Sequence, residues 1–171
     1  MADYDIEIIR KKYQMVPRTL VFVEKDGKIL TLNKSKKDSF GYGRLNGIGG
    51  HIEKGEEPYE SARREIFEEA NIKVGELDLA AILFIDIYEV PGIEVFVFKT
   101  TYLTGEVRDS NEGHLEWMTR AELLAQPNLV KDMPFLLDLI NRHFPNTPPF
   151  MVKYIYDENG DLRIDYVSGR E

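Results

Sequence analysis

The sequence contains no cysteine, so disulfide bonds and thiolate metal sites are excluded. It also lacks any apolar run approaching the roughly 18 to 20 residues that a membrane-spanning helix needs. The first residues, MADYDIEIIRKKYQM, place no apolar stretch beside a basic start, so we expect no secretory signal. These absences predict a cytoplasmic protein that does not interact with membranes.

Basic residues are in the minority, because 22 Lys and Arg stand against 30 Asp and Glu and give a formal net charge of −8 at pH 7. Such a surface repels long nucleic acids, so no nucleic-acid partner is expected. It also repels a free triphosphate. An anionic substrate would therefore need a divalent metal ion as mediator.

The chain has 171 residues, of which 43% are hydrophobic, and this is enough for one globular domain with a sizeable core. No internal repeat, low-complexity linker or break in composition divides it, so residues 1–171 are predicted to form a single domain. The sequence leaves open whether the protein is a monomer or a homodimer.

Turn signals and apolar patterns predict a mixed α/β (α+β) chain. Two-stranded hairpins are expected around the turns at 26–27, 91–92 and 159–160. Helices are expected over 58–70, 119–126 and 133–144. A further short strand is expected over 114–118.

Three acids of the helix expected over 58–70 share one side. Glu65, Glu68 and Glu69 fall within about a third of the helix circumference. A separate apolar stripe contains Tyr59, Ala62, Ile66 and Ala70. This stripe should pack on the sheet and hold the acids at the edge of the core. Arg64 lies one turn before Glu68 and can pair with it.

A solvated surface is the common explanation of a Glu-rich helix face. However, like charges at this spacing destabilise a helix by about a few tenths of a kcal/mol per pair. The helix also follows a Gly-rich turn that ends in another acid, Glu56. Clustered carboxylate oxygens suit Mg²⁺ or Mn²⁺. On the residues alone, both explanations stay open.

The spacing of these residues forms a longer pattern, with fixed positions at Gly50, Glu56, Arg64-Glu65-Ile66, Glu68-Glu69 and Ile72. This pattern resembles the signature of the Nudix hydrolases. Asn71 stands where the signature has a Gly. After Gly, Asn is the residue that most readily adopts the left-handed backbone conformation. The resemblance implies a Nudix fold, in which a mixed sheet is sandwiched between helices and a hairpin lies at the C-terminus. It also implies hydrolysis of a nucleoside diphosphate linked to another group.

The resemblance further implies roles for individual residues. Glu65, Glu68 and Glu69 would be metal ligands for Mg²⁺ or Mn²⁺, with the carbonyl of Gly50 nearby. Arg64 would orient one of these acids through an ion pair, and Glu56 would support the site. The metal would neutralise phosphate charge and lower the pKa of an attacking water.

Residues outside this signature resemble the MutT-like oxidised-purine nucleoside triphosphatases. In the run FGYGRLNGIGGHIEKGE, Asn46 stands where the animal-type enzymes bind the purine, and Phe40 would line the base pocket. Glu112, in GEVRDSNEGHLEW, matches an acid that serves as an added metal ligand or as the base that activates water. The segment QPNLVKDMPF lacks the Trp and the Asp pair of the animal-type enzymes. There Asn128 is the nearest equivalent to the purine-reading Asn of the bacterial enzymes.

Simpler explanations exist for several of these residues. Asn46 and Asn128 also suit turns or loops, and Glu112 also suits a solvated loop. His51 follows the signature Gly where many relatives carry Lys, and it could touch a phosphate. A basic cluster that could attract a polyphosphate contains Lys34, Lys36 and Lys37.

Together these resemblances predict a hydrolase that converts a nucleoside triphosphate to a nucleoside monophosphate and pyrophosphate. The favoured substrate is an oxidised purine nucleotide such as 8-oxo-dGTP. The attacking water would lose its proton to Glu69 or Glu112, and Glu69 is expected to be the most important residue. Another nucleotide, a dinucleoside polyphosphate or capped RNA are the alternatives within the same reaction class. A nucleotide-binding sensor is the alternative outside it, but such proteins usually lose acids of the signature that are all present here.

Overall fold

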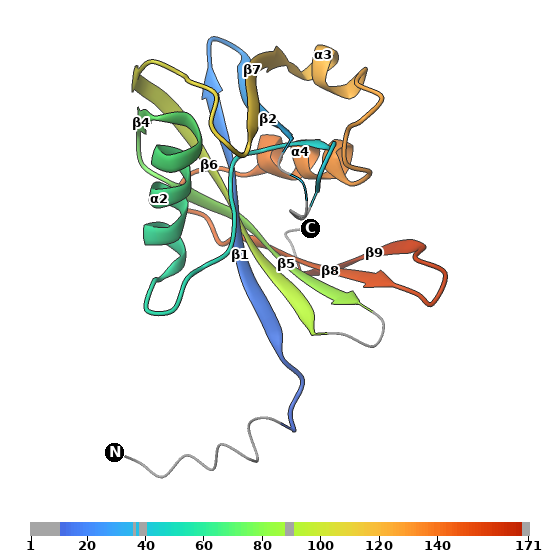
Figure 1. The fold of residues 1–171 in the computed structure, drawn as a ribbon. Coiled ribbons are helices and arrows are strands. Elements are labelled where there is room, and N and C mark those ends of the chain that lie inside the picture. Colours follow the sequence, from blue (N-terminus) through green and yellow to red (C-terminus); the bar gives the residue numbers. More distant parts are fainter. Residues whose placement is uncertain (1–10, 36, 38–40, 88–90, 169–171) are drawn as a thin grey trace.

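The computed structural model describes residues 11–35, 37, 41–87 and 91–168. Phe40, predicted to line a base pocket, lies outside these residues. The strands of one nine-stranded sheet are β1 (Met15–Lys25), β2 (Lys28–Lys34), β3 (Leu45–Asn46), β4 (Ile72–Val74), β5 (Asp78–Ile87), β6 (Gly92–Gly105), β7 (Gly113–Thr119), β8 (Phe150–Tyr156) and β9 (Leu162–Ser168). The helices are α2 (Pro58–Ala70), α3 (Arg120–Leu124) and α4 (Met133–Arg142). Figure 1 shows their arrangement.

The sheet is mixed, and its strands follow the order β3-β2-β1-β6-β5-β8-β9. β1 runs parallel to β6 and β5 runs parallel to β8, whereas the remaining neighbours are antiparallel. β1 and β2 pair only at their hairpin end, and β2 then pairs with β7. Along the edge of β1 that β2 leaves unpaired lies a stretch that we call the glycine segment (residues 47–51). It forms bridges at Val21↔Ile48 and Arg18↔His51.

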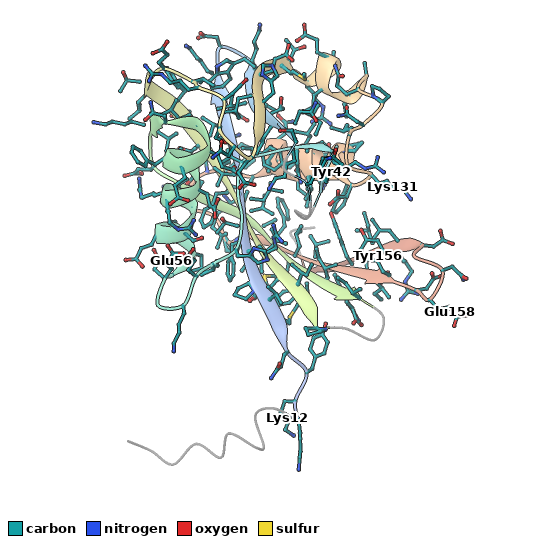
Figure 2. The ribbon with its side chains drawn as sticks, viewed as in Figure 1. Lys12, Tyr42, Glu56, Lys131, Tyr156 and Glu158 are labelled. Carbon is teal, nitrogen blue, oxygen red and sulfur yellow. The ribbon has the colours of Figure 1, made fainter. Side chains whose placement is uncertain are left out.

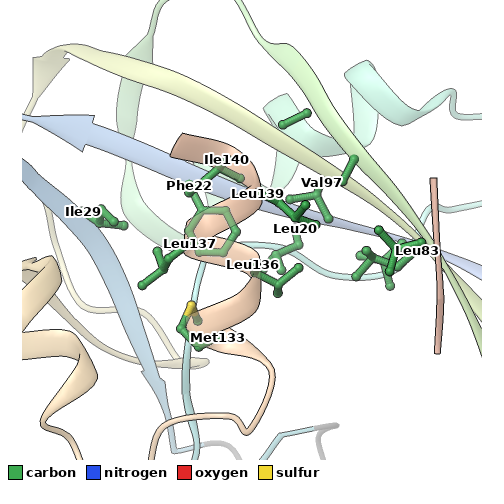
Figure 3. Close-up of a cluster of buried hydrophobic side chains, with 14 of the residues drawn as sticks. Leu20, Phe22, Ile29, Leu83, Val97, Met133, Leu136, Leu137, Leu139 and Ile140 are labelled. Atoms are coloured by element: carbon green, nitrogen blue, oxygen red, sulfur yellow. The ribbon is translucent and has the colours of Figure 1, made fainter. Parts of the chain in front are cut away.

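Helices cover both faces of this sheet, as predicted. Side chains alternate along β1, so Leu20 and Phe22 point to one face and Val21 and Val23 to the other. The first face packs against buried residues of α4, as Figure 3 shows, and these include Met133, Leu136, Leu137 and Ile140. The second packs against Ala62, Ile66 and Ala70 of α2. The predicted C-terminal hairpin is present as β8 and β9.

The ends of α2 also follow the prediction. Pro58 occupies the first turn, and Glu57 caps it in a capping box with Glu60. Asn71 ends the helix in left-handed conformation with φ 53°, as expected for a residue that replaces Gly. No helix among the described residues has both the length and the apolar character needed to cross a membrane.

Candidate active site

The glycine segment forms one wall of the site and is hydrogen-bonded to β1. Ile48 and Val21 exchange both of their backbone hydrogen bonds, and the N–H of Thr19 donates to the carbonyl of Gly50 at 2.9 Å. Gly49 has φ 146°, and a side chain at this position would collide with the carbonyl of Thr19. The segment can therefore lie this close to β1 only because it consists largely of glycine.

The facing wall is formed by acids of α2. Glu65 and Glu69 are buried, with side chains that are 11% and 3% exposed, whereas the side chain of Glu68 is 57% exposed. The N–H of Gly49 donates to Oε2 of Glu69 at 2.9 Å. The carboxylate of Glu65 lies so close to Gly50 that a side chain there would overlap it. The three acids that the helix places on one side thus differ sharply in burial.

Burial changes the acidity of these two carboxyl groups. It raises the pKa of Glu69 to about 7, although Lys34 and the N–H of Gly49 act in the opposite direction. It also raises the pKa of Glu65, against the effect of Arg64. A buried carboxylate is costly unless a cation compensates its charge. The two acids therefore form a place where an added cation would be stabilised.

Arg64 ties α2 to the loop before it. Its Nε lies 2.6 Å from Oε1 of Glu56, and its Nη2 donates to the carbonyl of His51 at 2.9 Å. Its Nη1 donates to Glu65 at 2.8 Å and to Glu68 at 3.2 Å. The hydrogen bonds from Arg64 lower the pKa of Glu56 to about 2. The predicted pair of Arg64 with Glu68 is present, and it is one contact of a larger network.

Glu112 reaches the same place from the loop between β6 and β7. The carbonyl of Glu112 accepts a hydrogen bond from the N–H of Ser35 at 2.9 Å, and its charge contributes to the raised pKa of Glu69. A cavity of about 570 Å³, here called the acidic cavity, opens between this loop, α2 and the glycine segment. Its lining includes Arg18, Lys34, His51, Glu65, Glu68, Glu69 and Glu112.

The donor groups around this cavity fit a hard divalent cation. They are carboxylate oxygens and the carbonyl of Gly50, which accepts one hydrogen bond and keeps a second lone pair. Across the described ranges, however, no three acidic or histidine side chains are already grouped closely enough to hold a metal ion. Glu65 and Glu68 instead contact Arg64. The donor chemistry thus fits, while a complete ligand set requires side-chain movement.

A second cavity, of about 320 Å³ and here called the apolar cavity, lies on the α4 side of the sheet. Its apolar lining includes Leu20, Leu83, Ile85, Ile93, Val95, Val130 and Leu136. Asn46 is part of this lining, and its Oδ1 accepts a hydrogen bond from the N–H of Gly47 at 2.8 Å. Lys131 and Tyr156, labelled in Figure 2, also line it, from the segment before α4 and from β8. An apolar cavity with a few polar groups is typical of a site for an organic ligand.

Two further polar groups in this cavity were not among the predicted site residues. Asp132 occupies the N-cap position of α4 without a capping hydrogen bond to its side chain, and burial raises its pKa. The side chain of Tyr154 on β8 is 1% exposed, and its hydroxyl has no hydrogen-bond partner of standard geometry among the described residues. Nearby Asp132 adds to the burial that raises the pKa of this phenol. The alternating apolar pattern of the C-terminal hairpin was the signal that could have placed Tyr154 and Tyr156 on one face.

Asn128 does not line either of these cavities. Its Nδ2 donates to Oδ1 of Asn33 at 3.2 Å and to the carbonyl of Gly43 at 3.3 Å. Its own carbonyl accepts a hydrogen bond from the N–H of Leu45 at 3.0 Å. The structure therefore places Asn128 where it braces the strand that carries Asn46, and Asp132 stands inside the cavity instead.

The two cavities adjoin, because Arg18, Lys34 and Gly49 line both of them. Lys34 is buried at this junction, where its Nζ donates to the carbonyl of Gly49 at 3.3 Å and lies 3.9 Å from Oε1 of Glu69. Nη1 of Arg18 lies 3.2 Å from Nε2 of His51. The site is thus one continuous depression, apolar at one end, acidic at the other and basic between them.

Two curated animal proteins are similar to this chain in sequence. The chain is 36% identical over 100 residues to an oxidized purine nucleoside triphosphate hydrolase of Danio rerio, an alignment that covers 58% of this chain and 63% of the relative. The protein of the same name from Mus musculus is 31% identical over the same shares of both chains. The chain thus spans somewhat less than two thirds of the length of these relatives.

A solved structure shares the fold of this chain, and a family model matches most of its sequence. The crystal structure of a MutT protein from Bacillus halodurans superposes with a TM-score of 0.73 at 24% identity and covers 88% of this chain and 98% of that one. At this identity the likeness concerns the fold alone. The model of the NUDIX domain matches residues 14–139, which include the glycine segment, α2 and Glu112. The chain therefore belongs to the NUDIX domain family.

Proposed function

We propose that this protein is a metal-dependent nucleoside triphosphate pyrophosphohydrolase. It would convert oxidised purine nucleotides such as 8-oxo-dGTP to the nucleoside monophosphate and pyrophosphate, and so remove them from the nucleotide pool. The adjoining cavities carry this proposal, because the apolar one suits a base and the acidic one suits a polyphosphate bound through metal. The names of the two animal relatives support the same substrate class.

Members of this family generally use divalent metal ions, and we propose Mg²⁺ or Mn²⁺ here. Glu65, Glu68, Glu69 and Glu112 would hold them together with the carbonyl of Gly50. A bound divalent ion supplies phosphate neutralisation and makes an attacking water more acidic. The absence of cysteine and the oxygen-rich lining agree with these hard ions.

The protein's own residues would position the reactants and move the proton. Water attacks a phosphorus atom in line with the oxygen that leaves, and the phosphoanhydride bond breaks. Glu69 or Glu112 takes the proton of that water. Without metal, burial raises the pKa of Glu69 to about 7. A divalent ion held beside this carboxyl group would lower that pKa, so Glu69 would be ionised and able to accept a proton. Arg64 holds Glu65 and Glu68 against the helix, which limits their freedom before substrate binds.

Base recognition is assigned to the polar groups of the apolar cavity. The amide of Asn46 can donate and accept hydrogen bonds, and Asp132 adds a carboxyl group in a partly buried position. A site that hydrogen-bonds a particular edge of a base rejects analogues that lack it, because its own polar groups are then left unpaired. Phe40 and Asn128 stay predictions, the first outside the described residues and the second outside this lining.

The test is product analysis on a panel of 8-oxo-dGTP, dGTP, 2-hydroxy-dATP, a dinucleoside polyphosphate and an ADP-sugar, with Mg²⁺, with Mn²⁺ and with EDTA. We expect metal-dependent release of monophosphate and pyrophosphate from 8-oxo-dGTP in preference to dGTP. Glu69→Gln should abolish turnover, and Arg63→Gln on the exposed side of α2 should not. Preferential turnover of dGTP, the dinucleoside polyphosphate or the ADP-sugar would refute the assigned substrate class, and binding without turnover would refute the enzyme and favour a sensor.

A further inference from the structure

Arg18 occupies an unusual position for a charged residue. It lies within β1, between Pro17 and Thr19, both of which hydrogen-bond to the segment that carries the signature glycine: the carbonyl of Pro17 accepts from Ile52 and the N–H of Thr19 donates to Gly50. Burial lowers the pKa of Arg18, with Glu65 and Glu69 acting against it. An arginine remains charged under these conditions, so the strand places a permanent positive charge beside the acids.

The side chain of Arg18 is also oriented. Its Nη1 lies 3.2 Å from Nε2 of His51, and the backbones of the two residues form an isolated bridge. Because a guanidinium can only donate, Nε2 of His51 acts as the acceptor. A guanidinium that is already held in place loses little conformational entropy when it binds an anion. Its N–H donors are also arranged to match two oxygens of a phosphate.

The junction of the two cavities defines which part of a nucleotide would meet Arg18. A nucleotide whose base fills the apolar cavity and whose distal phosphates reach the acids must pass the residues that line both, namely Arg18, Lys34 and Gly49. The phosphate next to the nucleoside is the group that follows the sugar. It is therefore the phosphate that arrives at the junction.

Resting on the function proposed above, we infer that Arg18 binds the phosphate that stays with the nucleoside after hydrolysis. Lys34 lines the same junction and assists, but it also contacts Gly49 and Glu69. Arg18 thus holds a phosphate through the protein alone, without a metal ion. The nucleoside monophosphate product would accordingly bind in the absence of divalent ions and would inhibit the enzyme competitively.

The experiment compares 8-oxo-dGMP with 8-oxo-deoxyguanosine as ligands of the full chain in EDTA, by calorimetry. The two ligands differ only in the phosphate. A charge-assisted hydrogen bond to this phosphate should make the wild type bind the monophosphate at least about tenfold more tightly. Arg18→Gln should remove most of this ratio while nucleoside affinity stays the same, which also shows that the variant is folded. Arg18→Lys should retain part of it.

Arg63→Gln is the matched control, because it makes the same change of charge on the exposed side of α2 and should leave the ratio unchanged. If Arg18 only balances the charge of the acids, Arg18→Gln will tighten Mn²⁺ binding and leave the ratio as in the wild type. That result overturns the role of Arg18 but not the proposed function. The same holds for a wild type that hydrolyses 8-oxo-dGTP but binds both ligands equally in EDTA. A wild type that neither turns over 8-oxo-dGTP nor binds these ligands overturns the proposed function and this inference together.

Discussion

The buried carboxyl group of Glu69 makes the stability of the metal-free protein depend on pH. The folded protein holds this group at a pKa of about 7, against an ordinary value of 4.5. Below pH 4.5 the folded and the unfolded chains both keep the proton. Above pH 7 both lose it, and the folded chain then carries a buried charge. The free energy of unfolding should therefore fall as pH rises from about 4.5 to about 7.

The size of the effect follows from the difference between the two pKa values. At 1.36 kcal/mol per unit of pKa, Glu69 should account for a loss of about 3 kcal/mol across this range. Its side chain is only 3% exposed, so solvent screening reduces the figure little. For a chain of this length such a loss lowers the melting temperature by about 6 to 12 °C.

Glu69→Gln isolates this contribution, because a glutamine can still accept the hydrogen bond from Gly49 but cannot ionise. We expect similar stability of variant and wild type near pH 4.5, and a variant that is more stable by about 3 kcal/mol at pH 7.5. Other groups with shifted pKa values, such as Asp132 and His114, are present in both proteins and cancel in the difference.

The assay is urea unfolding in EDTA at several pH values, followed by circular dichroism and by the single tryptophan, Trp117. Glu68→Gln serves as the control for net charge, since it removes the same charge from an exposed position. Added Mn²⁺ should restore the stability of the wild type at pH 7.5, because a ligand of the folded state stabilises it, and should do so less for Glu69→Gln. A difference between wild type and Glu69→Gln that stays constant with pH would refute the reasoning.

Three further changes test the local geometry. Gly50→Ala should lower kcat/KM about a hundredfold with little loss of helix by circular dichroism, because the new methyl group displaces the carboxylate of Glu65; unchanged kinetics would contradict this. Arg64→Lys should lower the free energy of unfolding, measured by urea unfolding, by about 1 to 3 kcal/mol, because an ammonium cannot reproduce the contacts to Glu56 and the helix acids. An equally stable variant would show that this network does not stabilise the fold. Asn71→Gly should raise the free energy of unfolding by up to about 1 kcal/mol, and with it the melting temperature, because glycine adopts the left-handed conformation more readily. A lower melting temperature would argue against this cap geometry.

The elements that local rules govern could be predicted from the sequence. Pro58 and Asn71 mark the two ends of α2, and turn residues mark the hairpins, because these signals act over a few neighbouring residues. The pair of Arg64 with Glu68 follows from helical spacing. The contact of Arg64 with Glu56, which is shorter, depends on how the loop closes onto the helix, and no local pattern specifies this.

The apolar cavity could not be predicted for a related reason. Its lining comes from β1, β3, β5, β6, β8, α4 and the segment before α4, with Lys34 of β2 and part of the glycine segment. These elements meet only because β1 pairs with β6 and β5 with β8 in parallel. Parallel partners lie far apart in the sequence, so hydrophobic periodicity does not identify them. Asp132 and Tyr154 therefore went unnoticed, whereas Asn46 was found through the resemblance of its motif.

The burial of the acids on α2 is a further feature that the sequence could not predict. Helical spacing places Glu65, Glu68 and Glu69 on one side, but it is the glycine segment that buries the first and the last.

The net charge of −8 predicted that an anionic substrate needs a metal ion, yet it is a property of the whole chain. Locally, Arg18, Lys34 and His51 line the acidic cavity. If Arg18 binds the phosphate next to the nucleoside, the metal has only the remaining phosphates to neutralise. Removing metal should then weaken triphosphate binding far more than monophosphate binding, a difference that net charge alone does not predict.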